Sequence, residues 1–228
     1  MTGSRPRNSQ NQESEAPPSP SDKRRARTIL KKLREVHSDA RCSLSHDNAF
    51  QLIVATLLSA QCTDARVNKV TPALFKKYRT PGALGRAVPE DLEGIIYSTG
   101  FYKAKARNLI GLGRKLEEEF GGKVPETMEN LLSLPGVARK TANVVLGVSF
   151  AKAEGVVVDT HVKRIAKRLG FTRHEAPQKI EKDLMALFPK STWIDLSHIL
   201  IYHGRRLCGA RKPMCDSCPV NKQCSGPG

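Results

Sequence analysis

A lysine lies within a segment that could bind a phosphate backbone, because residues 134–143 are Leu-Pro-Gly-Val-Ala-Arg-Lys-Thr-Ala-Asn. Pro135 and Gly136 favour a tight turn, and the small and apolar residues that follow favour a helix. Free N–H groups and the dipole at such a helix start attract phosphate. Lys140, held beside a phosphate backbone, could act as a nucleophile. The segment therefore predicts chemistry on nucleic acid, with simple phosphate or surface contact by Lys140 as the alternative.

One carboxylate, Asp159, follows Lys140 by 19 residues, at the expected start of another helix. A carboxylate there is a good N-cap, because it accepts hydrogen bonds from free backbone N–H groups. It could also take up a proton or stabilise positive charge in a reaction at Lys140. Beside Lys140 and the hairpin, we favour the catalytic role.

Four of the six cysteines fall in the last 21 residues, separated by gaps of six, two and five residues. They are Cys208, Cys215, Cys218 and Cys224. Four thiolates so close together suit a soft metal centre. Structural zinc usually shows two close cysteine pairs; only one is present, so the spacing favours an iron–sulfur cluster over zinc, and both over disulfides. Cys42 and Cys62 are expected to be small buried side chains.

The chain is strongly basic, with 38 Lys and Arg against 22 Asp and Glu among 228 residues and a formal net charge of +16. The first 28 residues contribute only +3 of this charge, so the excess belongs to the folded body. A polyanionic partner such as nucleic acid is the natural inference, although a merely soluble basic protein would have the same composition. Arg205, Arg211 and Lys212 flank or separate the tail cysteines. A metal centre would hold these cations in place; otherwise they belong to a solvated loop.

The remaining pattern predicts helices joined by short turns. Residues 1–21 are rich in Ser, Pro, Gln and Asn and are predicted to be disordered. Apolar residues at helical spacing begin near Ser21 and recur in nine further segments. Those segments are 50–58, 67–78, 89–97, 103–120, 128–134, 139–148, 159–169, 176–188 and 193–206. Pro81 and Gly82 are expected in a gap, and 155–158 is too short for a sheet, so we predict an all-α protein.

No apolar run approaches the length needed to span a bilayer, and the N-terminus lacks the apolar segment of a secretory signal. Cysteines without such a signal indicate a reducing compartment.

Three features occur together in the same order as in the endonuclease III family: the segment 134–146, the sequence Val-Asp-Thr-His-Val at 158–162, and the cysteine tail. The chain resembles this family of helix-hairpin-helix DNA glycosylases from about residue 28 to 224. The resemblance implies two helical domains that flank a DNA-binding cleft. These are a six-helix barrel domain with the hairpin motif at 42–152, and a [4Fe–4S] cluster domain that combines 22–41 with 153–228.

The resemblance also implies an activity: a bifunctional DNA glycosylase and abasic-site lyase that excises oxidised pyrimidines from duplex DNA. The expected partner is double-stranded DNA with damaged bases or abasic sites, bound by a monomer with no membrane contact. The expected location is the bacterial cytoplasm, at the nucleoid.

The resemblance places the nucleophile at Lys140 and its carboxylate partner at Asp159. The amine of Lys140 would attack C1′ of a flipped nucleotide, displace the base and form a Schiff base, and loss of the C2′ proton would cleave the strand by β-elimination. The amine must be neutral, a state that burial and a neighbouring cation such as Arg139 favour. A glutamine that fills the vacated space falls at Gln61, and a wedge between stacked bases falls at Phe101.

A helix-end glutamine and a core phenylalanine are the alternatives for these two positions. The full set of expected DNA contacts is Gln61, Phe101, Gly136, Val137, Ala138, Arg139, His161, Arg205, Arg211 and Lys212. Ala138 stands where the family pattern has glycine, which predicts a less close phosphate and a small loss of affinity. Phe101 stands where leucine is common, and His161 is expected to be structural or to contact phosphate.

Three other functions compete with this interpretation. An adenine glycosylase of the same superfamily would lack the lysine and usually carry a further C-terminal domain, whereas Lys140 is present and the chain ends just after Cys224. A non-enzymatic DNA-binding protein would not need both Lys140 and Asp159. A redox protein would not need the basic body or the hairpin.

Overall fold

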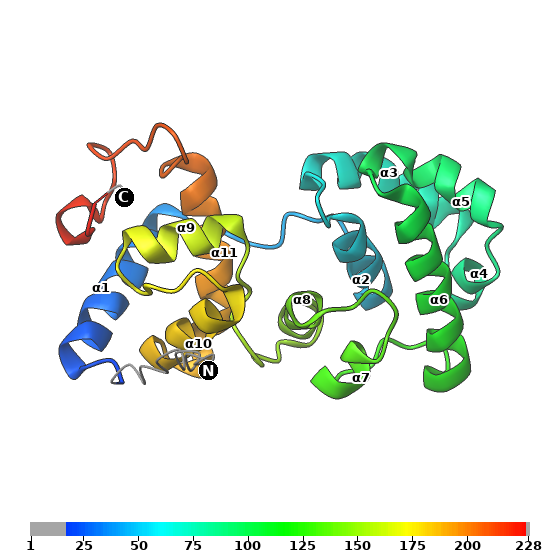
Figure 1. The fold of residues 1–228 in the computed structure, drawn as a ribbon, viewed down its shortest axis with the longest axis horizontal. Helices are drawn as coiled ribbons and strands as arrows, with labels where there is room; N and C mark the ends of the chain where they lie inside the picture. The colour runs from blue at the N-terminus through cyan, green and yellow to red at the C-terminus, as the bar shows by residue number, and fades with distance from the viewer. Residues whose placement is uncertain (1–16, 227–228) are drawn as a thin grey trace, which may run out of the picture.

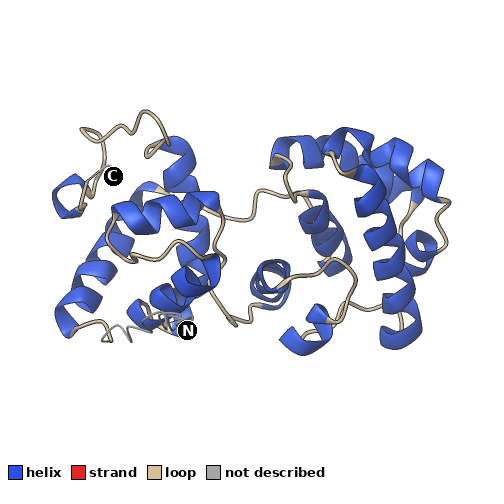
Figure 2. Cartoon of the chain, in the orientation of Figure 1, coloured by secondary structure: helices blue, strands red, loops and turns tan. Residues whose placement is uncertain are grey.

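The computed structural model describes residues 17–226, and this part of the chain contains helices and loops but no strand (Figure 2). The helices are α1 (Pro20–Val36), α2 (Ala49–Leu58), α3 (Asp64–Lys77), α4 (Pro81–Gly85), α5 (Pro89–Ile96), α6 (Tyr102–Phe120), α7 (Met128–Leu132), α8 (Arg139–Phe150), α9 (Thr160–Arg168), α10 (Pro177–Leu187) and α11 (Trp193–Arg206). They form two lobes, with α2 to α8 in one and α1 and α9 to α11 in the other (Figure 1). The all-α, two-lobed prediction is confirmed.

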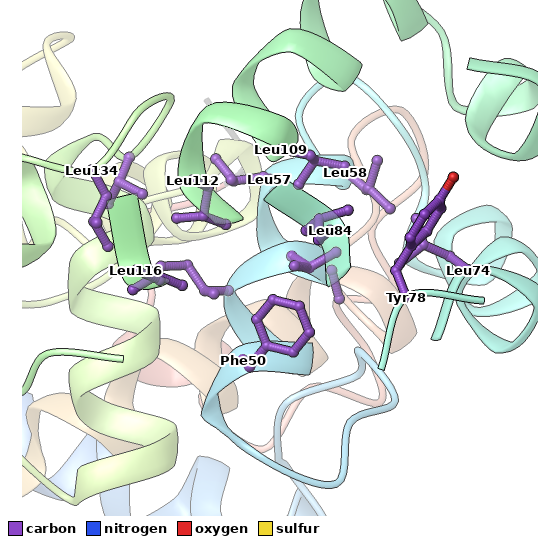
Figure 3. Packing of buried hydrophobic residues seen from close by; sticks show 14 of the residues in the cluster. Phe50, Leu57, Leu58, Leu74, Tyr78, Leu84, Leu109, Leu112, Leu116 and Leu134 are labelled. Carbon is purple, nitrogen blue, oxygen red and sulfur yellow. The ribbon is translucent and has the colours of Figure 1, made fainter. Parts of the chain in front are cut away.

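The first lobe is built around α2, which is apolar along nearly its whole length and has eight buried residues. A helix that is apolar on all sides must be surrounded, and α3, α6 and α8 pack around it, with α4 packed against α6. Phe50, Leu58, Leu74, Leu84 and Leu112 meet in this core (Figure 3). The lobe therefore provides a rigid base for α7 and α8, the two helices on either side of the hairpin.

The second lobe takes residues from both ends of the chain. Apolar side chains of α1 pack with buried residues between Val156 and Val220. α1 begins with a capping box, in which Ser19 and Asp22 each accept from the other's backbone N–H, and Pro20 occupies the first helical position. The two cores draw on 44–146 and on 26–33 with 156–220. The domain limits given above remain a prediction.

Two local expectations differ from the structure. Pro81 and Gly82, expected in a gap, belong to α4, which the Thr80 side chain caps by accepting from the N–H of Ala83. Helix α1 begins at Pro20, within the predicted disordered tail, and the rest of that tail up to residue 16 lies outside the described residues.

No described helix is long and apolar enough to cross a bilayer.

Candidate active site

The predicted hairpin lies between α7 and α8, and its shape depends on one glycine. Gly136 has φ of +77°, and a Cβ there would lie 2.9 Å from the side-chain nitrogen of Asn108. Both the positive φ and the close approach make any other residue strained at this position. The turn thus holds the start of α8 in a fixed direction.

Ala138 occupies the N-cap of α8 with φ of −97° and ψ of 168°, an extended conformation open to any residue. Alanine is therefore under no backbone strain at this position, and the less close phosphate and small loss of affinity expected from it remain predictions. No side chain caps α8, so its first-turn N–H groups remain available to an outside acceptor. Such a helix start is an anion-binding site.

Lys140 and Asp159 line one cavity of about 110 Å³ between the two lobes. Lys140 lies in the first turn of α8, and its side chain is exposed. The structure therefore does not bury the amine, and a neutral Lys140 remains a prediction. Asp159 is half-buried and caps α9, where its Oδ1 accepts a hydrogen bond of 2.8 Å from the N–H of Val162. The capping role is thus present, and it fixes the carboxyl group at the cavity.

The neighbours of Lys140 on α8 are held by the opposite lobe. Arg139 donates from Nε to both carboxylate oxygens of Glu181 on α10, at 3.0 and 3.2 Å. Asn143, one turn after Arg139, donates to the same carboxylate at 2.9 Å. A Cβ on Gly155 would lie 2.0 Å from Glu181 Oε1, so only glycine leaves room for this contact. We call these four residues the Glu181 clamp.

His161 and Arg205, both expected to contact DNA, make interactions within the protein. Burial holds the pKa of His161 below its ordinary value, and Arg164 lies 3.2 Å from its Nδ1. Arg205 lines the cavity, but its guanidinium donates to Asp64 at 2.7 Å and to Ser43 at 2.9 Å. Arg139 is likewise engaged in the Glu181 clamp. Arg139 and Arg205 therefore join the lobes at the cavity, whereas the contact between His161 and Arg164 stays within α9.

The two residues expected to open the duplex lie on two loops of the first lobe. Gln61 is exposed between α2 and α3, and Phe101, two-thirds exposed, precedes α6. Both have left-handed backbones, with φ of 52° for Gln61 and 48° for Phe101. Such conformations are uncommon outside glycine and cost free energy. Phe101 is therefore not a core phenylalanine, and both side chains point away from the core.

The four tail cysteines line one cavity in the second lobe, together with apolar side chains such as Ile165 and Leu169. All six cysteines of the chain are free thiols. Burial raises the pKa of the Cys218 thiol, and the three other tail thiols are close enough to raise it further. Arg168 of α9 donates to Cys208 Sγ at 3.2 Å and to the carbonyl of Gly209 at 2.8 Å.

The loop between Cys208 and Cys215 carries Arg211 and Lys212 at its surface. Both are exposed, and among residues 17–226 neither forms an ion pair. These two cations, unlike Arg205, are available to a phosphate.

Three polar residues of the site were not anticipated: Glu181, Asn143 and Asp64. Glu181 lies inside an amphipathic helix with no motif around it, and Asn143 and Asp64 have partners that are distant in sequence. Asn143 follows Lys140 by three residues, so one helical turn could have placed both at the same cavity.

Comparison with known proteins gives a consistent result. Residues 54–190 match the model of the HhH-GPD superfamily base excision DNA repair protein. The chain is 53% identical to endonuclease III of Synechocystis sp. over 90% of its length and 93% of the relative, and 44% identical to that of Bacillus subtilis over 86% and 89%. The solved structure of a trapped endonuclease III–DNA covalent intermediate, an estranged-adenine complex, superposes with a TM-score of 0.84 at 46% identity, covering 89% of this chain and 95% of that one. The chain therefore belongs to the endonuclease III family, within the HhH-GPD superfamily of base excision DNA repair proteins.

Proposed function

We propose that the protein is a DNA glycosylase and abasic-site lyase that removes oxidised pyrimidines from duplex DNA. The observation that carries the proposal is the cavity shared by Lys140 and Asp159, next to an uncapped helix start that suits a phosphate. The related endonuclease III trapped as a covalent DNA intermediate supports the same chemistry.

In the proposed mechanism the hairpin binds the phosphate of the damaged strand. Backbone N–H groups of Gly136 and of residues 138–140 surround the anion, while the N–H of Val137 donates to the carbonyl of Leu134 within the turn. The flipped nucleotide enters the cavity. The Nζ lone pair of Lys140 attacks the sugar C1′, the bond from C1′ to the base breaks, and the base leaves with that electron pair and takes up a proton.

The covalent adduct then rearranges to a Schiff base as the sugar ring opens. Loss of a proton from C2′ breaks the bond from C3′ to the phosphate oxygen, which completes β-elimination. Asp159 stabilises the positive charge that develops on the sugar, or accepts a proton, while its hydrogen bond to Val162 keeps it in place. Water then hydrolyses the Schiff base and frees Lys140.

Gln61 and Phe101 are proposed to keep the duplex open during this reaction. A glutamine amide can fill the space of the flipped base and hydrogen-bond the base left behind. The exposed ring of Phe101 can insert between stacked bases. Arg211 and Lys212 are proposed as phosphate contacts at the edge of the site.

We also propose that Cys208, Cys215, Cys218 and Cys224 hold a [4Fe–4S] cluster. The four thiols surround one largely apolar cavity, and their spacing has only one close cysteine pair, where structural zinc usually has two. A cluster binds each thiolate through a different iron, whereas zinc would draw all sulfurs to about 2.3 Å of one centre. The cluster would supply structural support to the loop that carries Arg211 and Lys212.

The cluster gives a spectroscopic prediction. We expect the native protein to be yellow-brown with a broad visible absorbance, and the Cys218→Ser variant to lose iron and most of that absorbance. Cys62→Ser, outside the tail, should keep both. A colourless wild-type protein with one bound zinc would contradict the proposal.

Asp159→Asn separates catalysis from helix capping. Asparagine caps helices about as well as aspartate, so we expect an unchanged melting temperature. Loss of the charge should slow base excision by about a hundredfold, as measured by single-turnover kinetics on a duplex with thymine glycol. Unchanged excision in a variant of normal stability would leave Asp159 as a cap only.

The function itself is tested by borohydride trapping. Wild-type protein mixed with a thymine glycol duplex and borohydride should form a covalent protein–DNA complex, and without borohydride it should release a β-elimination product. Base release without trapping or strand cleavage would identify a monofunctional glycosylase instead.

Relatives with this level of identity come from bacteria such as Synechocystis and Bacillus subtilis. We therefore propose a location in the bacterial cytoplasm, with nucleoid association through DNA and action as a monomer.

A further inference from the structure

A buried lysine lies between the two loops that carry Gln61 and Phe101. Lys105 of α6 is only 7% exposed. Its Nζ donates to the carbonyl of Leu58 and to the carbonyl of Thr99, both at 2.8 Å. Leu58 ends α2, three residues before Gln61, and Thr99 lies two residues before Phe101.

The backbone of Lys105 adds a third contact to the same region. Its N–H donates to the carbonyl of Phe101 at 3.0 Å, in the first turn of α6. One residue thus contacts Phe101 directly and holds the chain on the approach to both loops.

Burying this ammonium is costly, and the described part of the chain offers it no carboxylate. Burial lowers the pKa of Lys105, and the nearby Cys62 thiol opposes this shift, but no Asp or Glu side chain contributes. Its two carbonyl acceptors, one of them at the C-terminal end of α2, partly compensate for the lost water. An apolar side chain would fill the same space without this cost, so the ammonium is best explained by what it connects.

Both loops need such support because of their backbones. Gln61 and Phe101 have φ of 52° and 48°, a conformation that non-glycine residues keep only when their surroundings enforce it. We propose that Lys105 is a positioning residue that holds Gln61 and Phe101 at a fixed separation, so that both enter the duplex together. This inference rests on the proposed function, and it assigns Lys105 to the opening of DNA rather than to the reaction at the sugar.

The test compares a lesion in a paired duplex, which the protein must open, with the same lesion in DNA that is already unpaired. One duplex carries thymine glycol paired with adenine, and the other carries the same lesion inside a three-nucleotide bubble. Single-turnover excision by Lys105→Met should slow by about tenfold on the paired duplex and stay within about twofold of wild type on the bubble. Lys115→Met, which removes an ammonium from the same helix, should leave both rates unchanged.

The outcomes are distinct. An equal slowing on both substrates, or none on the paired duplex, overturns the positioning role. If Lys105→Met does not fold, as judged by its thermal melt, Lys105→Gln takes its place. The quantity compared is the excision rate on the paired duplex divided by the rate on the bubble. A ratio equal to that of wild type overturns the proposal, and a lower ratio supports it. If the wild-type protein excises neither lesion, the proposed function fails and this role fails with it.

Discussion

Lys140→Gln should abolish borohydride trapping and reduce base excision and strand cleavage by at least about a thousandfold. Glutamine keeps most of the side-chain length but has no lone pair able to form a Schiff base with C1′. Because Lys140 is exposed and in the described residues makes no hydrogen bond or ion pair, the folded state should not change. The measurements are a gel of trapped complexes and a thermal melt.

Binding separates this catalytic effect from a loss of DNA affinity. Lys140→Gln should still bind a thymine glycol duplex within about tenfold of wild type, since one lost cation removes little of the phosphate contact. Lys152→Gln, which removes a charge just beyond the end of α8, should trap normally. Trapping by Lys140→Gln at wild-type yield would mean that another amine is the nucleophile.

Glu181→Gln should weaken both the joint between the lobes and the reaction. The glutamine amide can still accept from Asn143 but can no longer form a charged pair with Arg139. Since the Arg139 side chain is 45% exposed and that of Glu181 is 9% exposed, we expect a loss of about 1–2 kcal/mol of folding free energy rather than the larger value of a fully buried pair. Urea unfolding measures this difference.

The effect on catalysis should exceed what stability explains. Arg139 and Asn143 flank Lys140 on α8, so release of the Glu181 clamp lets the nucleophile shift relative to Asp159. We expect excision to slow by about tenfold to a hundredfold at temperatures where the variant is fully folded, mainly in kcat. Glu175→Gln, on an exposed carboxylate paired with Lys163 and Lys167, should leave kcat unchanged. Equal kcat for Glu181→Gln and wild type would limit the clamp to a structural role.

Most helices were predictable because their cores follow a regular spacing. α4 was not, since five residues are too few for a periodic pattern, although Thr80 and Pro81 are a typical helix start. The start of α1 was misplaced because Ser19 and Pro20 share the polar composition of the preceding tail. The limits of these two helices are therefore set by capping residues, which hydrophobic periodicity does not detect.

The residues of the site also form two groups, those that the sequence singles out and those that only the structure reveals. Lys140, Asp159 and the tail cysteines belong to local motifs, so the sequence sufficed to single them out as candidates, and the structure gathers them at two cavities. The roles assigned to them remain proposals. Glu181 contacts a residue 42 positions away, and Lys105 reaches a carbonyl 47 positions away. Nothing in the sequence distinguishes either from the other charged residues of amphipathic helices. Only the packing of the helices brings them to their partners.

The composition of the second lobe has a consequence for synthesis. α1 leaves the ribosome first, but the residues it packs against, from Val156 to Val220, leave last. The core of the first lobe is complete once residue 146 has emerged, so that lobe can fold during translation, as domains generally do. Until then, α1 has no partner to pack against and is joined to the folded first lobe by the short loop that leads to α2 (Figure 1). The lobe that carries Asp159 therefore closes in the last stage of synthesis, and the nascent chain has its hairpin before it has its active site.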